Sequence, residues 1–369
     1  MKALLNMVKV TITKLIVPCS LLAALLVFLP SSLQANATGV CSNCHTMHNS
    51  QGGQPMNFDS STTPNVFLLR GSCISCHGQN PGGSSNIILL GNVPQVLHSA
   101  TTDLAGGNFK YLVTDDNRGH NVIDTGNPED NGSMFPPPGD ENTTGILNSN
   151  FTCAGKFGCH GNRTVEDKFL ALKGAHHADD SVLKFGGINE SGQGGSTGLS
   201  YRFLNGVKGG EDSEWQANST ASVHNEYKGA PDRGTESTVS SPGGNTISGL
   251  CAECHGNFHG PAGDDIAYQN ASPWLRHPTD IVIPNTGEYA QYNTPNTAAS
   301  RYSLTAPLAR QNIPNSSSGS VTLNSDVIMC LSCHRAHASP YFKIMRWDYK
   351  SSTLSTALSG CNVCHTSKN

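Results

Sequence analysis

The 369-residue chain is poor in the side chains that build a large core, because only 36% of its residues are hydrophobic and it contains 39 Gly and 20 Pro. Its 23 Lys and Arg against 27 Asp and Glu give a formal net charge of −4, which argues against a basic surface for nucleic acid. Thirteen Cys and fifteen His are more than an ordinary globular enzyme contains, which indicates a bound group that fills the interior.

The N-terminal segment has the pattern of an export signal. Three lysines precede an apolar stretch at residues 15–29, and a small-residue A-x-A pattern ends at Ala37. We therefore expect residues 1–37 to be a signal peptide and residues 38–369 to be the mature chain. A retained membrane anchor is the alternative, but Pro18 interrupts the apolar stretch, which is short for a bilayer span. An exported protein without a stable membrane span is expected, with twelve of the thirteen cysteines.

Five cysteine pairs in the mature chain have the form C-x-x-C-H, which is the attachment signature of haem c. Two thiols add to the two vinyl groups of one porphyrin, and the histidine that follows lies under the iron as its proximal ligand. Zinc sites and disulfides are the alternatives, but neither requires a histidine directly after each pair. The five motifs are Cys41, Cys44 and His45; Cys73, Cys76 and His77; Cys251, Cys254 and His255; Cys330, Cys333 and His334; and Cys361, Cys364 and His365.

A sixth cysteine pair has five residues between the thiols instead of two. Cys153 and Cys159 are followed by His160, and the loop between the thiols contains two glycines that let the first thiol reach its vinyl group. A disulfide between Cys153 and Cys159 is the alternative. Because a histidine again follows the second cysteine, we interpret this segment as the third haem site in chain order. All mature cysteines are then used, and six haems c are predicted.

Nine histidines outside the motifs are candidates for the distal ligand, on the other face of each iron. Their number favours bis-His irons over His/Met ligation. His48, His337 and His259 follow a proximal histidine by three or four residues, so each would lie on the same side of a helical turn and would have to bind a neighbouring haem. His224 lies in a polar stretch and is expected to be exposed and not to be a ligand. The long segments between motifs contain the others, which are His98, His120, His176, His177 and His277.

The segments between the motifs are expected to be mostly loops. They are rich in Gly, Asn, Ser, Thr and Pro, as at 126–150, 186–198 and 314–325. With one haem for about every 55 residues, porphyrin would replace much of the usual apolar interior. The predicted fold class is therefore irregular, mostly coil with short helices and few short strands, in a single domain (38–369) that wraps around a row of haems.

A few short regular elements are predicted between the motifs. One helix is expected at 165–173, with Thr164 as its N-cap and Gly174 as its stop. Short strands are expected at 86–90 and 281–283. The helix would place His176 and His177 just beyond its end.

Four segments around the motifs have a pattern of their own: 39–50, 118–122, the pair His255 and His259 with 275–278, and 329–339. These segments resemble the OmcS-like hexahaem outer-surface cytochromes of metal-reducing bacteria, which polymerise into extracellular conductive filaments. The resemblance is strong at both ends of the mature chain and weak in its middle.

This resemblance implies a largely coil fold with bis-His haems in a continuous stack and one distal ligand donated across the subunit boundary. The family position that donates it matches His48, which would bind the iron of the Cys330 to His334 haem in the adjacent protomer. The third motif departs from the family, which has two residues between its thiols and a further histidine shortly afterwards. His177, or His176, is the substitute ligand that we expect.

The leading hypothesis is therefore a non-enzymatic electron-transfer protein, polymerised as an extracellular filament or held at the outer cell surface. Its partners would be copies of itself and redox partners. The alternative is a monomeric periplasmic carrier whose haems are all ligated from within the chain. A haem reductase is less expected, because it requires an iron with an open face, whereas the spare histidines outnumber the irons.

Overall fold

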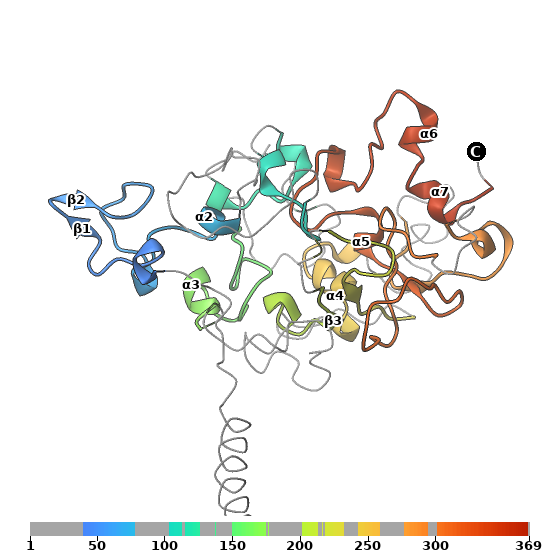
Figure 1. Ribbon diagram of the computed structural model, residues 1–369, viewed down its shortest axis with the longest axis horizontal. Helices are drawn as coiled ribbons and strands as arrows, with labels where there is room; N and C mark the ends of the chain where they lie inside the picture. Colours follow the sequence, from blue (N-terminus) through green and yellow to red (C-terminus); the bar gives the residue numbers. More distant parts are fainter. Residues whose placement is uncertain are drawn as a thin grey trace, which may run out of the picture.

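The computed structural model describes residues 40–77, 103–112, 115–125, 137, 150–174, 176, 201–212, 216, 218–231, 243–258, 277–293 and 301–367. The expected signal peptide, the expected strand at 86–90 and the histidines His98, His177 and His259 lie outside these residues. The loop expected at 186–198 and nearly all of the loop expected at 126–150 also lie outside the described residues. Most of the described chain is coil with short helices and small strands, as the sequence predicts (Figure 1).

The described helices are short, and five of them overlap a cysteine motif while a sixth, η12, directly follows one. The α-helices are α2 (Ile74–His77), α3 (Lys168–Ala171), α4 (Ile247–Ala252), α5 (Cys330–Cys333), α6 (Leu354–Ala357) and α7 (Cys361–Cys364). The 3₁₀ helices are η1 (Cys41–Asn43), η2 (Val66–Leu68), η3 (Phe109–Tyr111), η4 (Asp116–Arg118), η5 (Ile123–Thr125), η10 (Tyr201–Phe203), η11 (Gly243–Asn245), η12 (Gly256–Phe258), η13 (Gly287–Gln291) and η14 (Phe342–Ile344).

The described strands form three separate two-stranded antiparallel sheets. The strand expected at 281–283 is confirmed to within one residue, and Ile283 continues its pairing by donating a backbone hydrogen bond to Asp326. The loop expected at 314–325 is also confirmed as coil and turns. The paired strands are β1 (Ser50–Gln51) with β2 (Gln54–Pro55), β3 (Gly209–Gly210) with β4 (Glu226–Tyr227), and β5 (Ile281–Val282) with β6 (Val327–Ile328).

The helix expected at 165–173 begins later than predicted, at Lys168. The N-cap is Asp167, whose carboxylate accepts hydrogen bonds from the backbone N–H groups of Phe169 (2.8 Å) and Leu170 (2.9 Å). Thr164 was the wrong cap, because its hydroxyl lies 2.7 Å from Oδ1 of Asn162 instead. The helix also ends earlier than predicted, at Ala171, and Gly174, with a left-handed φ of +80°, lies in the turn that follows it.

Buried apolar side chains form three small clusters. Each cluster includes or contacts a residue inside a cysteine motif, namely Leu331, Ile74 and Val363. The clusters therefore anchor the motifs to the surrounding chain. Their buried members are Tyr201, Leu204, Val207, Tyr227, Ile247, Leu250, Ala309, Val327, Met329 and Leu331 in the first; Ile74, Phe109, Leu112 and Val122 in the second; and Ile283, Tyr292, Leu308 and Ile328 in the third.

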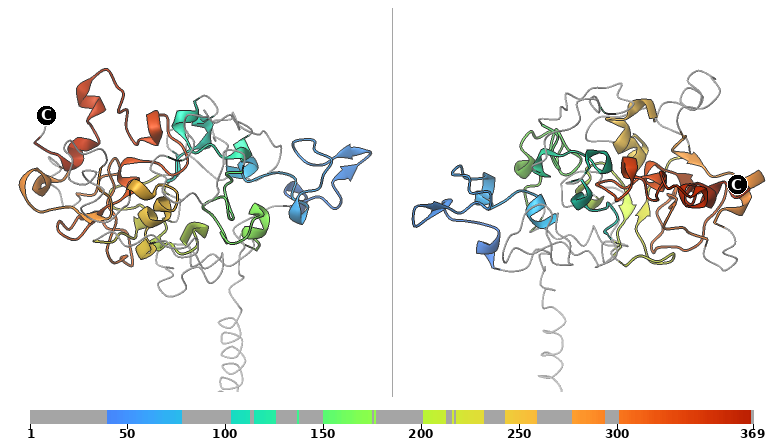
Figure 2. Two further views of the ribbon diagram at one scale, coloured as in Figure 1. Left: turned by 180° about the vertical axis from the view of Figure 1, so that it is seen from behind. Right: turned by 90° about the horizontal axis from the view of Figure 1, so that it is seen from above.

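Residues 40–70, which we call the N-terminal arm, project from the rest of the described chain in every view (Figures 1 and 2). Gly52 and Gly53 connect β1 to β2, and their φ values of +58° and +78° suit a tight two-residue hairpin turn. Behind this hairpin, the buried side chain of Asn49 accepts backbone hydrogen bonds from Met56 and Asn57 at 3.1 and 2.8 Å. The arm therefore has a defined internal structure.

A group of buried charges lies where β4 and β6 approach the chain at Arg310. The Arg310 guanidinium donates to Glu226 at 3.0 Å and contacts Asp326, and all three residues are buried. Burial alone would raise the pKa of Glu226, but hydrogen bonding to His224 and the charge of Arg310 lower it overall. Arg310 and His224 therefore favour the ionised form of Glu226, whereas burial raises the pKa of Asp326.

Replacing Arg310 with methionine should lower the free energy of unfolding by about 3–5 kcal/mol, because two buried carboxylates would lose their cation. Guanidinium denaturation followed by tryptophan fluorescence measures the change. The control is Arg118→Met, which removes a half-exposed guanidinium from its 3.1 Å contact with Asp115 and should cost at most about 1 kcal/mol. Equal losses in the two variants would contradict the role of burial.

His224 is part of this buried group, and the expectation that it is exposed was wrong. It is fully buried, and its ring stacks on Tyr302 with centroids 3.7 Å apart and planes 5° from parallel. Its Nε2 lies 3.4 Å from Oε1 of Glu226. The polar composition around His224 correctly indicates a loop. It does not indicate that Tyr302 and Arg310, which are distant in the sequence, pack against this loop and bury it.

Candidate multihaem centre

All six cysteine motifs close with the same backbone hydrogen bond. In each motif the N–H of the proximal histidine donates to the carbonyl oxygen of the first cysteine. In five motifs this bond closes a helical turn, and in the third it closes a longer loop, so that both thiols and the imidazole belong to one local unit. The donor to acceptor distances are 2.9 Å for His45, 3.0 Å for His77, 3.0 Å for His160, 2.9 Å for His255, 3.1 Å for His334 and 2.8 Å for His365.

The third motif has this closure despite its three additional residues. The N–H groups of Cys159 and His160 both donate to the Cys153 carbonyl, at 3.2 and 3.0 Å. Gly155 has a φ of +82°, and a Cβ at Gly158 would come within 2.4 Å of a backbone oxygen, so the intervening loop needs both glycines. No disulfide joins Cys153 and Cys159.

Changing both Cys153 and Cys159 to serine should reduce the haem count by one, from six to five, because these thiols are the attachment points of the third haem. Intact-protein mass spectrometry and the pyridine haemochrome yield give the count. The control is Ser42→Ala, which changes a residue inside an attachment motif and leaves every thiol in place. If the two cysteines form a disulfide, the double variant will have the same haem count as the unmodified chain.

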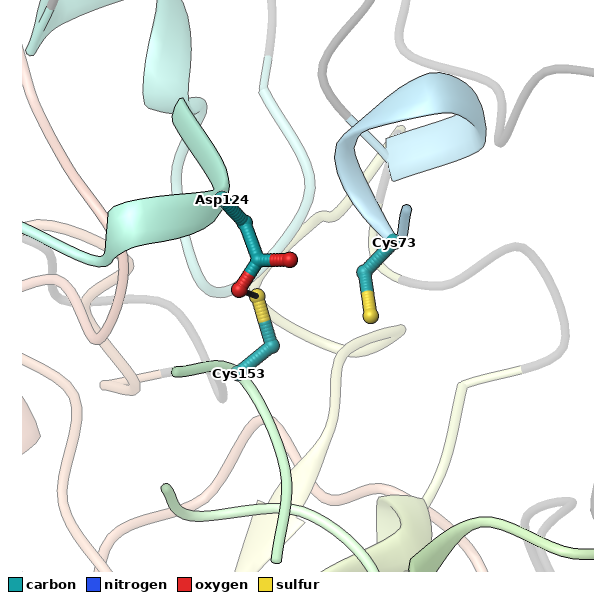
Figure 3. A group of neighbouring side chains, drawn as sticks. All are labelled: Cys73, Asp124 and Cys153. Atoms are coloured by element: carbon teal, nitrogen blue, oxygen red, sulfur yellow. Dashed lines mark hydrogen bonds between the residues drawn. The ribbon is translucent and has the colours of Figure 1, made fainter. Parts of the chain in front are cut away.

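Thiols of successive motifs lie close together. The Cys73 and Cys153 sulfur atoms and an Asp124 carboxylate oxygen lie within 4.8 Å of one another (Figure 3). Asp124 also pairs with Lys168. These three side chains are close enough to bind one metal ion, but the two thiols are the first cysteines of the second and third motifs. We therefore interpret the cluster as the meeting point of two haem edges.

Thiols of the later motifs also lie close to thiols of the motif that comes next in the sequence. A hydrogen bond to Cys330 and then burial raise the pKa of the Cys251 thiol, and the nearby Cys159 thiol adds to this shift. The pKa of Cys333 is raised to about 12, first by burial and then by Cys361. The thiols thus place the second to sixth motifs next to one another in sequence order.

Four proximal imidazoles each lie next to an imidazole from outside the motifs. A bound metal ion lies about 2 Å from an imidazole nitrogen, and the centre of the ring lies about 1 Å beyond that nitrogen. Two imidazoles that bind opposite faces of one ion therefore have ring centres roughly 6 Å apart. The four observed separations match this value, so the residues present fit six-coordinate iron. The pairs are His77 with His176 (6.2 Å), His160 with His337 (6.0 Å), His255 with His120 (6.3 Å) and His365 with His277 (6.2 Å).

The two imidazoles from outside the motifs that lie beside His160 and His255 come from adjacent backbone segments. His120 donates its backbone N–H to the His337 carbonyl at 3.0 Å, and Nδ1 of His120 lies 2.6 Å from the Ala336 carbonyl oxygen. The His337 ring stacks on Phe109 with centroids 4.9 Å apart. A Cβ at Gly106 would come within 2.7 Å of the His337 ring, so a glycine is required there. These contacts orient both rings.

Burial keeps these two imidazoles uncharged at neutral pH. The pKa of His120 is lowered to about 4, first by burial and then by His255. The pKa of His337 is lowered to about 3 by burial and by the nearby His160 and His120. Neutral imidazole is the form that binds a metal ion.

Three proximal imidazoles contact the same kind of backbone turn, which lies in η2, η10 and η14. Each turn has two successive non-glycine residues with positive φ, and the carbonyl oxygen of the first lies close to Nδ1 of the imidazole. If Nδ1–H donates to this carbonyl, Nε2 is left unprotonated and can bind a metal. The pairs are His45 with Phe67 (2.9 Å), His160 with Arg202 (3.1 Å) and His334 with Lys343 (2.9 Å).

Sequence analysis missed these turns. The carbonyl groups that accept from these imidazoles lie 22, 42 and 9 residues after their histidines, so the spacing has no fixed period. Their residues are also apolar, aromatic or basic, types that rarely adopt the left-handed region. The shared signal is four residues of which at least three are apolar or aromatic, at 66–69, 201–204 and 342–345, and such segments are too common to identify a turn.

The histidines that follow the first and fifth motifs are placed differently. His337, three residues after His334, lies beside the third motif, whereas the equivalent His48 is exposed on the N-terminal arm. Within the described chain, no aromatic ring is paired with His334, which is itself exposed. His48 and His334 are therefore both accessible to another molecule. The side chain of Cys76 and the candidates His98, His177 and His259 lie outside the description.

Six attachment motifs in a coil-rich chain with paired imidazoles are the features of a multihaem c-type cytochrome. No model of a known protein family matches the chain. The chain is 27% identical to the C-type cytochrome OmcS of Geobacter sulfurreducens, over 94% of its own length and 88% of the length of that protein. The resemblance to the OmcS-like cytochromes is thereby confirmed over nearly the whole chain.

Two solved structures from the same bacterium also align with the chain. The OmcS nanowires, determined by cryo-EM, match at 19% identity and a TM-score of 0.47, over 90% of this chain and 100% of that one. The Outer Membrane Cytochrome S filament matches at 18% identity and a TM-score of 0.40 over the same shares. Both TM-scores are below 0.5, so we assign individual ligands only from the distances between residues of this chain.

Among the described residues, no helix has both the length and the apolar character that crossing a bilayer requires.

Proposed function

We propose that this protein is a hexahaem c-type cytochrome that conducts electrons through bis-His haems, polymerised as an extracellular filament that delivers electrons to external acceptors. The observation that carries the proposal is the set of four imidazole pairs separated by 6.0–6.3 Å. When bound, haem supplies the one-electron chemistry. The chain supplies the thiols, the axial imidazoles and a close spacing of the sites.

The ligand assignment follows from these pairs. His176, His337, His120 and His277 are the distal ligands of the second, third, fourth and sixth motifs, and they support bis-His coordination because both faces of the iron are then occupied. Such coordination keeps the reduction potential low compared with His/Met ligation. The closeness of thiols from successive motifs supports a continuous row of haems in sequence order, within one mature domain at 38–369.

The fifth motif supports polymerisation. Its proximal His334 has no imidazole partner within the described chain, and the exposed His48 lies on the projecting N-terminal arm. His48 has the same spacing from His45 that His337 has from His334, and His337 serves a different motif from the one that it follows. We assign His48 as the distal ligand of the fifth haem in a neighbouring protomer.

Haem content and spin state test the proposal. Secreted protein without the predicted signal peptide should contain six haems by intact mass and by pyridine haemochrome. Its oxidised form should give only low-spin ferric signals in electron paramagnetic resonance, because every iron has two imidazoles. A haem yield near zero would refute the cytochrome assignment. A high-spin signal from assembled protein would refute complete bis-His coordination and would favour a haem reductase.

The monomeric periplasmic carrier is distinguished by assembly. Negative-stain microscopy of secreted material should show filaments if the proposal is right. A single small species in size-exclusion chromatography at all concentrations, with six low-spin haems, would support the carrier instead. In that case the distal ligand of the fifth motif would come from the chain itself.

A further inference from the structure

The sixth motif differs from the first, third and fifth motifs in what lies beside Nδ1 of its proximal imidazole. Nδ1 of His365 lies 3.2 Å from Oε1 of Glu288, a carboxylate oxygen. In the three other motifs the group at this position is an uncharged backbone carbonyl. The terminal motif thus has a formal negative charge next to its iron ligand.

Glu288 is held in this position from several directions. Its side chain is only 11% exposed, and the residue lies in the first turn of η13. The hydroxyl of Thr366, the residue after His365, donates to the Glu288 backbone carbonyl at 2.6 Å. The neighbouring Tyr289 packs edge-on against the His365 ring with centroids 5.2 Å apart. The carboxylate and the imidazole therefore belong to one tightly packed unit.

A carboxylate beside Nδ1 changes the properties of the ligand. It increases the electron density that the imidazole donates to its metal, as in carboxylate–histidine–metal arrangements. Its charge is little screened because the side chain is mostly withdrawn from water. Both effects favour the ferric iron, which has one more positive charge than the ferrous form, and both oppose reduction.

We infer that Glu288 is a positioning residue that lowers the reduction potential of the haem at the sixth motif below the value that a carbonyl partner would give. This inference rests on the proposed hexahaem cytochrome. The haem of the sixth motif would then be harder to reduce than those of the first, third and fifth motifs and would give up an electron more readily.

The experiment is a potentiometric titration of full-length, haem-loaded protein, monitored by visible absorbance and electron paramagnetic resonance. Glu288→Gln retains the shape of the side chain and removes its charge. We expect about one sixth of the absorbance change to move to higher potential. The expected change in the equilibrium constant for reduction is about tenfold, which corresponds to about 59 mV for one electron. Glu288→Asp, which retains the charge, should shift that component less than Glu288→Gln does.

The matched control is Glu166→Gln, which removes one negative charge from a side chain that is 73% exposed and lies 3.9 Å from Lys156. All six components should titrate as in the unmodified protein. Unchanged potentials in Glu288→Gln would overturn the inference while leaving the proposed function intact. Loss of a low-spin haem in Glu288→Gln would also overturn it, because Glu288 would then be required for ligation. An unmodified protein without low-spin haem would instead refute the proposed function.

Discussion

Replacing His337 with alanine will convert one of the six haems from low spin to high spin and leave the other five unchanged. The His337 ring lies 6.0 Å from that of His160 and stacks on Phe109, so its loss opens one face of the third iron. Electron paramagnetic resonance of the oxidised protein should show a high-spin ferric signal from about one sixth of the iron, since one of six sites loses an axial ligand. Covalent haem content should stay at six.

His224→Ala is the matched control for this experiment. His224 is also a buried histidine with a stacked aromatic ring, but it lies against Tyr302 and is not paired with a proximal imidazole. The control should therefore be less stable and remain fully low spin. A fully low-spin His337→Ala protein would contradict the assignment of His337. A high-spin His224→Ala protein would show that buried histidines affect the irons without being ligands.

Replacing His48 with alanine will abolish filaments while all six haems stay covalently attached. The imidazole of His48 is exposed on the N-terminal arm, and Met47 beside it is 88% exposed, so this surface can contact a second molecule. In the proposed assignment, the fifth haem of the neighbouring protomer then lacks its distal ligand. Negative-stain microscopy should show dispersed particles, and one haem in six should be high spin.

Free imidazole separates ligation from assembly in the His48→Ala protein. Added imidazole should occupy the open face and restore the low-spin signal, but it should not restore filaments, because it does not connect two chains. Ser50→Ala is the control. It removes the hydroxyl that lies 3.3 Å from Nδ1 of His48 and retains the ring, so filaments should persist. Unaltered filaments in His48→Ala would refute the intersubunit role.

The chemistry of the site could be predicted from the sequence because the attachment motif is local. The thiols and proximal imidazole of one haem lie within a few residues, so their spacing identifies them without any fold. The coil-rich class followed from the high Gly and Pro content and the sparse apolar residues. The strand at 281–283 was also predictable, since its residues are all β-branched. The N-cap of α3 could not be predicted from the sequence, because Thr164 and Asp167 are both residue types that favour the N-cap position.

The sequence named the candidate histidines for the other side of the proposed irons, but the tertiary structure decided which proximal imidazole each one lies beside. His120 and His337 are 217 positions apart in the sequence, and backbone pairing brings them together. The left-handed turns at Phe67, Arg202 and Lys343 are likewise defined by the imidazoles that they contact. A proximal ligand is placed by neighbours in the chain, whereas a distal ligand must approach the opposite face from elsewhere. Only the folded path of the chain determines which histidine does so.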